Sequence, residues 1–80
     1  MYLRSGYIVY PEGDIQEIEH ELRFNQMVDL NGFPLTPPLM SSKIIAYRVY
    51  KITRKENKGS NDNYYHLELI PAKELETYTI

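Results

Sequence analysis

Three segments of the chain have the patterning and composition of β-strands: residues 2–10, 43–54 and 64–70. They combine two-residue alternation with tyrosine, isoleucine, valine or leucine, which suit half-buried sheet positions. The polar, glycine-containing segment 56–63 is predicted to be a loop between the last two strands. We therefore expect a first strand near the N-terminal end and a long terminal hairpin over residues 43–70.

Alternation also assigns side chains to the two faces of these strands. In the last strand, the residues predicted to face inward are Tyr65, Leu67 and Leu69. Those predicted to face outward are Tyr64, His66 and Glu68. In the strand before it, one face carries Ile45, Tyr47 and Val49, and the other carries Ile44, Ala46, Arg48, Tyr50 and Ile52. Apolar groups on both faces indicate a strand inside a sheet or one bent across a small barrel.

Residues 15–24 fit two structures. As a strand, they turn four charged residues outward and turn the alternate residues Ile18, His20, Leu22 and Phe24 inward. As a helix, they begin at an Asp14 cap and align Ile15, Ile18 and Leu22 in one stripe. The strand explains every position and follows a turn at residues 11–14, so we favour it. Glutamate and leucine prefer helices, so the helix stays open.

The middle of the chain is rich in turn signals. A short apolar run, 27–30, precedes Asn31-Gly32, which is typical of a hairpin turn. Residues 33–42 contain three prolines, which cannot donate to a sheet, so we expect an extended loop or an edge there. Pro71 is predicted to end the last strand. Residues 72–78 fit one helical turn, and the alternative is a frayed tail over residues 71–80.

These elements predict a single, mainly β domain over residues 1–80. We expect a small antiparallel sheet or a partly open barrel of four to five strands, with the long hairpin 43–70 and at most one short helix. The chain has 80 residues, of which 42% are hydrophobic, and no cysteine. The lack of cysteine fits a reducing compartment, and the first residues lack the apolar core of a signal peptide. We therefore expect a cytoplasmic protein, and no membrane partner, since no apolar run is long enough to span a bilayer.

Charge is separated along the chain although its net value is only −2. Residues 12–29 contain six acidic residues and one arginine, a net charge of −5. Residues 43–58 contain six basic residues and one glutamate, a net charge of +5. An acidic and a basic segment can face each other within one subunit or between two, and a symmetric dimer would bring them together twice.

Residues suited to catalysis are few. His20 and His66 are the only histidines, and the serines stand in no nucleophile motif. There is no phosphate-binding glycine loop, and two histidines without cysteine are a poor basis for a zinc site. We therefore predict a protein that is not an enzyme and that uses neither a metal nor another cofactor.

Tyrosine is the distinctive residue, with 8 in the chain against 2 phenylalanines and no tryptophan. Its large ring and its hydroxyl suit binding surfaces that meet water. The predicted surface comprises Tyr50, Lys51, Arg54, Tyr64 and His66, with Phe33, Leu35 and Leu39 as an apolar annex. The predicted function is a non-catalytic protein-interaction module that binds another protein or a second copy of itself. The alternative is single-stranded nucleic-acid binding through the tyrosine, lysine and arginine residues of the hairpin 47–66, since such sites pair cations with aromatic rings.

Overall fold

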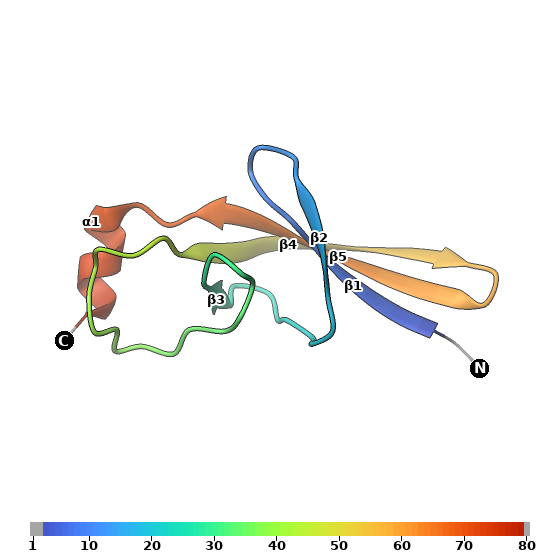
Figure 1. Ribbon diagram of the computed structural model, residues 1–80, viewed down its shortest axis with the longest axis horizontal. Coiled ribbons are helices and arrows are strands. Elements are labelled where there is room, and N and C mark those ends of the chain that lie inside the picture. The colour runs from blue at the N-terminus through green and yellow to red at the C-terminus, as the bar shows by residue number, and fades with distance from the viewer. Residues whose placement is uncertain (1–2, 80) are drawn as a thin grey trace.

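A computed structural model describes residues 3–79 and confirms a mainly β fold with one short helix. The strands are β1 (Leu3–Val9), β2 (Ile15–Ile18), β3 (Met27–Val28), β4 (Tyr47–Asn57) and β5 (Ser60–Leu69). The helix α1 (Ala72–Leu75) runs into a 3-10 turn, Glu76–Tyr78 (Figure 1). Of the two alternatives for residues 72–78, the chain adopts the helical one. Among the described residues, no helix has the length and apolarity needed to cross a membrane.

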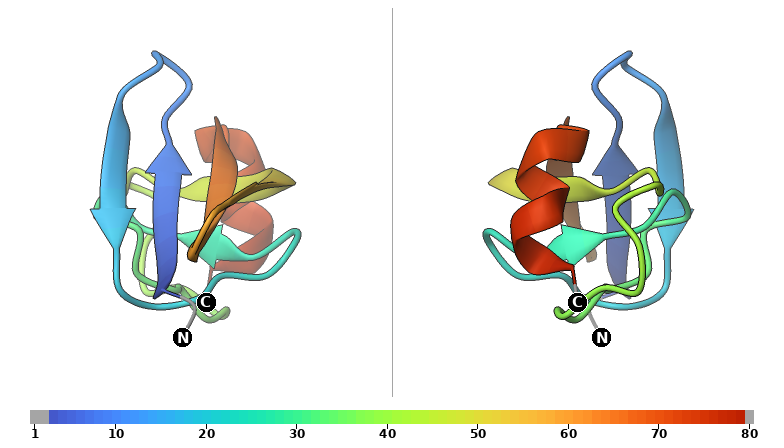
Figure 2. Two further views of the ribbon diagram at one scale, coloured as in Figure 1. Left: turned by 90° about the vertical axis from the view of Figure 1, so that its right-hand side faces the viewer. Right: turned by 90° about the vertical axis from the view of Figure 1, so that its left-hand side faces the viewer.

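The strands form one curved sheet in the order β2-β1-β5-β4-β3, which closes only halfway into a barrel (Figure 2). Three of its pairings are antiparallel, and β1 pairs with β5 in parallel. The sheet is therefore mixed, whereas the sequence suggested an antiparallel one. A parallel pair needs a long connection between its strands, and here β2, β3 and β4 all lie between β1 and β5 in the chain.

The predicted terminal hairpin is formed by the two longest described strands, β4 and β5. They run along the longest dimension of the molecule, 46 Å, and meet at a turn that contains Gly59 (Figure 1). β4 begins at Tyr47, four residues later than the sequence pattern indicated. Its partner strand ends at Leu69, directly opposite Tyr47, and Pro71 follows two residues later. Residues 43–45 therefore have no strand to pair with.

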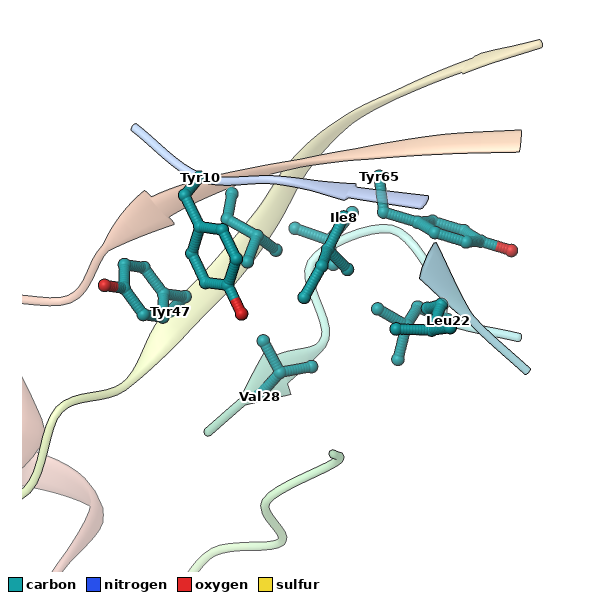
Figure 3. Close-up of a cluster of buried hydrophobic side chains, with 9 residues drawn as sticks. Ile8, Tyr10, Leu22, Val28, Tyr47 and Tyr65 are labelled. Atoms are coloured by element: carbon teal, nitrogen blue, oxygen red, sulfur yellow. The ribbon is translucent and has the colours of Figure 1, made fainter. Parts of the chain in front are cut away.

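The inner face of the sheet carries the core. Nine buried residues form the main cluster: Ile8, Tyr10, Ile18, Leu22, Val28, Tyr47, Val49, Tyr65 and Leu67 (Figure 3). The rings of Tyr10 and Tyr47 meet edge to face with their centroids 5.5 Å apart. The prediction that Tyr47 and Tyr65 lie inside is confirmed, since they are 7% and 3% exposed. A second cluster of Leu39, Ala46, Ile70 and Leu75 joins the helix to the proline-rich loop.

The segment 15–24 is a strand only at its start. Residues 15–18 pair with β1, and the chain then bends at residues 19–20. Ile18 and Leu22 are buried as predicted, but Phe24 is 68% exposed, so its predicted inward orientation is wrong. Alternation fails at Phe24 because the strand has already ended. Asn25 next to it has a φ of 68°, and its N–H donates a 2.7 Å hydrogen bond to the carbonyl of Val49.

We expect the stability of the fold to fall as the pH rises above about 10, in part because of Tyr10. Burial raises the pKa of the Tyr10 phenol, and Tyr47, Asp29 and Glu12 raise it further. The phenol donates a 2.6 Å hydrogen bond to the carbonyl of Leu30, which requires its proton. The unfolded chain therefore ionises this group at lower pH than the folded chain, which favours unfolding as the pH rises. Urea denaturation from pH 8 to 11 is expected to show a shallower decline for Tyr10→Phe than for the wild type.

Candidate functional site

One face of the sheet is covered by the chain itself and the other is open. Between β2 and β4 the chain crosses the inner face, where Leu22 and Val28 enter the core (Figures 2 and 3). The outer face carries residues that alternate with the core positions. We call its aromatic part the tyrosine face, which comprises Tyr7, Val9, Tyr50, Lys51, Thr53, Tyr64 and His66.

Two tyrosines from strands far apart in the sequence stack at the centre of this face. The parallel register places Tyr7 of β1 directly beside Tyr64 of β5. Their ring centroids are 5.1 Å apart, and the planes differ by only 18°. Both side chains are half-buried, so each ring keeps part of its area in water. We call this stacked pair the platform; it combines aromatic ring area with hydroxyl groups that tolerate water.

A β-bulge brings a third tyrosine to the same face. The register of β4 against β5 shifts between Val49 and Lys51, so Tyr50 and Lys51 both turn outward. The ring of Tyr50, 48% exposed, lies 6.4 Å from the ring of His66. A 3.0 Å hydrogen bond between His66 Nε2 and the hydroxyl of Thr53 fixes the imidazole. The bulge therefore extends the aromatic surface from β5 onto β4.

The charged groups on the outer face balance one another. The basic ones all belong to β4 and are Arg48, Lys51 and Lys55. The acidic ones belong to β2 and β5 and are Glu17, Asp62 and Glu68. Arg48 forms ion pairs with Glu68, at 3.3 Å, and with Glu74, and the register places Lys55 opposite Asp62. Among the described side chains, the face thus has no net charge, but its positive and negative groups lie on different strands.

The structure brings together four of the predicted site residues and separates a fifth. Tyr50, Lys51, Tyr64 and His66 share the outer face. Arg54 points to the inner face, where its Nε donates to Asn63 Oδ1 at 3.3 Å and where it lines a cavity of about 270 Å³ with Glu21 and Tyr65. The basic cluster expected on the hairpin is therefore divided between two faces, because Lys51 and Arg54 are three residues apart in the regular part of β4 and so face opposite sides of the sheet.

The predicted apolar annex does not join this face. Leu39 is only 5% exposed and belongs to the core, so it offers no side-chain surface to a partner. Leu35 is half-buried and packs against the same second cluster. Phe33 is 57% exposed, but its ring stacks on His20 beside β2, 5.1 Å from centroid to centroid. A proline-rich loop places its apolar residues by long-range packing, which the sequence pattern does not reveal.

Tyr7, which shares the platform with Tyr64, was not among the residues predicted from the sequence. Alternation within residues 2–10 separates Tyr7 from the buried Ile8, so its exposure was readable. The contact of Tyr7 with Tyr64 could not be read from the sequence, because the pairing of β1 with β5 joins segments more than fifty residues apart. Local pattern carries no register for such a parallel pair.

The two histidines do not converge on a common site. His20 Nε2 donates a 2.7 Å hydrogen bond to the carbonyl of Gly32, beside β2. His66 lies on the outer face and is bonded to Thr53. Within residues 3–79, no group of three or more histidine, aspartate or glutamate side chains is arranged to hold a metal ion.

Comparison with known proteins gives a family and nothing about its role. Neither the search of curated proteins nor the search of solved structures found a match to this chain. One family match covers residues 2–78, and its description reads "Uncharacterised Treponema protein". Because this match spans nearly the whole sequence, the chain belongs to that family of Treponema proteins.

Proposed function

We propose that this protein is a non-catalytic interaction module that binds a second copy of itself through the tyrosine face. The supporting observation is the open platform of Tyr7 and Tyr64, together with Tyr50 and His66, on a sheet face without net charge. Tyrosine is enriched at protein interfaces, because it offers a large rigid contact area and a hydroxyl that tolerates water. Balanced charge allows two such faces to approach without repulsion.

The shape of a single chain supports the proposal that a partner covers part of its surface. Its accessible surface is 5833 Å², whereas a compact monomer of this mass exposes about 5,000 Å². The excess, roughly 800 Å², is close to the area that each partner contributes to a standard interface. The radius of gyration is 13.7 Å, against about 12 Å for a compact chain of this length. The molecule is therefore elongated and has area to spare for a partner.

The distribution of charge on the outer face favours a copy of the same chain. A two-fold axis through the face would place β4 of one copy over β5 of the other. Lys55 would then approach Asp62 of the second copy, and the same contact would form twice. Such pairs fix the orientation of a complex more than they add affinity. The rings at the centre would supply most of the contact area.

Light scattering and sedimentation at rising protein concentration test this proposal. We expect the mass to rise from one chain to two. Tyr50→Ala removes an exposed ring from both copies and is expected to weaken association by roughly tenfold or more, as for an interface anchor. Phe24→Ala is the control, because Phe24 is an even more exposed aromatic residue, at 68% against 48% for Tyr50, but lies outside the tyrosine face, and it should leave association unchanged.

Two outcomes would overturn the proposal. One is a strictly monomeric wild type at high micromolar concentration. The other is binding of a single-stranded oligonucleotide tighter than about 1 mM that weakens as salt is raised. That result would favour the nucleic-acid alternative, in which Lys51 and Lys55 of the outer face contact phosphates.

A further inference from the structure

The free edge of β2 borders a groove that the proposed self-association does not use. β2 is the first strand in the sheet order, and none of the described strands pairs with its outer edge. A groove of about 510 Å³ lies there between the strand residues Gln16 and Glu17 and the turn residues Asn31 and Phe33. An unpaired strand edge presents a row of main-chain donors and acceptors to any extended segment that lies beside it.

The far wall of this groove is held in place before any partner binds. Asp29 Oδ1 accepts hydrogen bonds from the N–H groups of Asn31, at 2.8 Å, and of Phe33, at 2.9 Å. The His20 ring stacks on the Phe33 ring and donates to the carbonyl of Gly32. The backbone N–H and the ring of Phe33 are therefore both held in place, while 57% of the residue stays exposed. A preorganised aromatic wall lowers the entropic cost of binding.

The electrostatics of the groove select a basic partner. The segment 12–21 contains five acidic residues and neither lysine nor arginine. Glu17 and Glu19 line the groove itself. Alternate side chains of an added strand point to the same side, so lysines at every second position would meet these carboxylates together. The exposed Phe33 ring offers a further contact to a cation or to an apolar side chain.

From this geometry we infer that the β2 edge binds an extended basic peptide segment of another protein, which adds to the sheet as a sixth strand. Main-chain hydrogen bonds to β2 would supply affinity. Glu17, Glu19 and Phe33 would select the side chains. The site is separate from the tyrosine face, so it serves a monomer and a self-associated form alike.

The probe is an acetylated seven-residue peptide that alternates lysine and valine, titrated into the full chain and followed by backbone amide NMR shifts. We expect saturable shifts centred on residues 15–20 and 31–33. The same peptide with glutamate in place of lysine tests charge. A version with every second amide N-methylated keeps the charge but cannot pair with a strand. We expect both to bind at least tenfold more weakly.

Protein variants separate this site from general acidity. Glu17→Gln combined with Glu19→Gln is expected to weaken lysine-peptide binding by roughly tenfold, at the strength of two charge contacts. Glu76→Gln, which removes an exposed acidic group from the 3-10 turn after α1, is the control and should bind as the wild type. Equal binding of the N-methylated peptide, equal losses in both variants, or shifts confined to the outer face would each refute strand addition at β2. None of these results depends on whether the chain self-associates.

Discussion

Leu67→Ala is expected to lower the free energy of unfolding by about 3–4 kcal/mol. Leu67 is 2% exposed and lies opposite Val49 in the centre of the main core cluster. Its removal forfeits the transfer of a large apolar side chain from water and leaves a cavity that the sheet closes only in part. A domain of this length has a total stability of roughly 4–12 kcal/mol. The substitution is thus expected to take the chain close to its unfolding threshold.

Leu69→Ala provides the matched control two residues along the same strand. Leu69 is 55% exposed, although it has the same chemistry and the same predicted face as Leu67. We expect its replacement to cost less than about 1 kcal/mol, as for a surface position. Urea denaturation followed by circular dichroism measures both. Equal losses would contradict the placement of β5, since the two leucines would then be equally buried.

The difference between these leucines shows how far local pattern reaches. Alternation correctly placed Tyr65 and Leu67 in the core, because both lie in the regular part of β5. It failed at Leu69, where the strand ends and the following residue, Ile70, turns into the second cluster instead. Alternation describes a strand but not its end. The end depends on what the chain packs against next.

The bulge in β4 defeated the pattern in a different way. The sequence assigned Tyr50 and Ile52 to one face, but the extra residue in the register turns Ile52 to the inner side and keeps Tyr50 outside. Ile52 lies opposite the buried Tyr65, and Arg54 follows it to the inner face. Bulges carry no strong sequence signal. The inserted residue therefore separated Tyr50 from Ile52, which regular alternation had placed on the same face.

The candidate site was predictable where it depends on the hairpin and hidden where it depends on distant strands. Tyr64 and His66 were assigned outward from alternation alone, and the structure places both on the outer face. Tyr7 joins them only through the parallel pairing of β1 with β5. The β2 groove likewise needs a turn more than ten residues away to supply Phe33. Separated segments meet through packing, and a single sequence does not record which ones meet.

Gly32→Ala is expected to cost about 2–3 kcal/mol, the second largest loss among these variants. Gly32 has a φ of 86°, a backbone conformation that residues other than glycine rarely adopt. A Cβ at this position would lie 2.8 Å from Cδ1 of Ile8, which is fully buried in the core. The substitution therefore adds a steric clash to a backbone penalty. Thermal denaturation measures the combined effect.

Gly13→Ala isolates the backbone part of this loss. Gly13 has a φ of 102°, and nothing lies within 4 Å of the position that its Cβ would occupy. Its replacement is expected to cost only about 1 kcal/mol, the conformational penalty alone.

The steric part of the Gly32 effect can then be assigned to Ile8 by a double-mutant cycle. Ile8→Val removes Cδ1 and costs about 1 kcal/mol in the wild type. In the Gly32→Ala background, Ile8→Val should cost less or become stabilising, because it removes the Cδ1 atom that clashes with the new Cβ. Additive losses would show instead that the turn does not pack against Ile8, and the fixed wall of the β2 groove would lose its support.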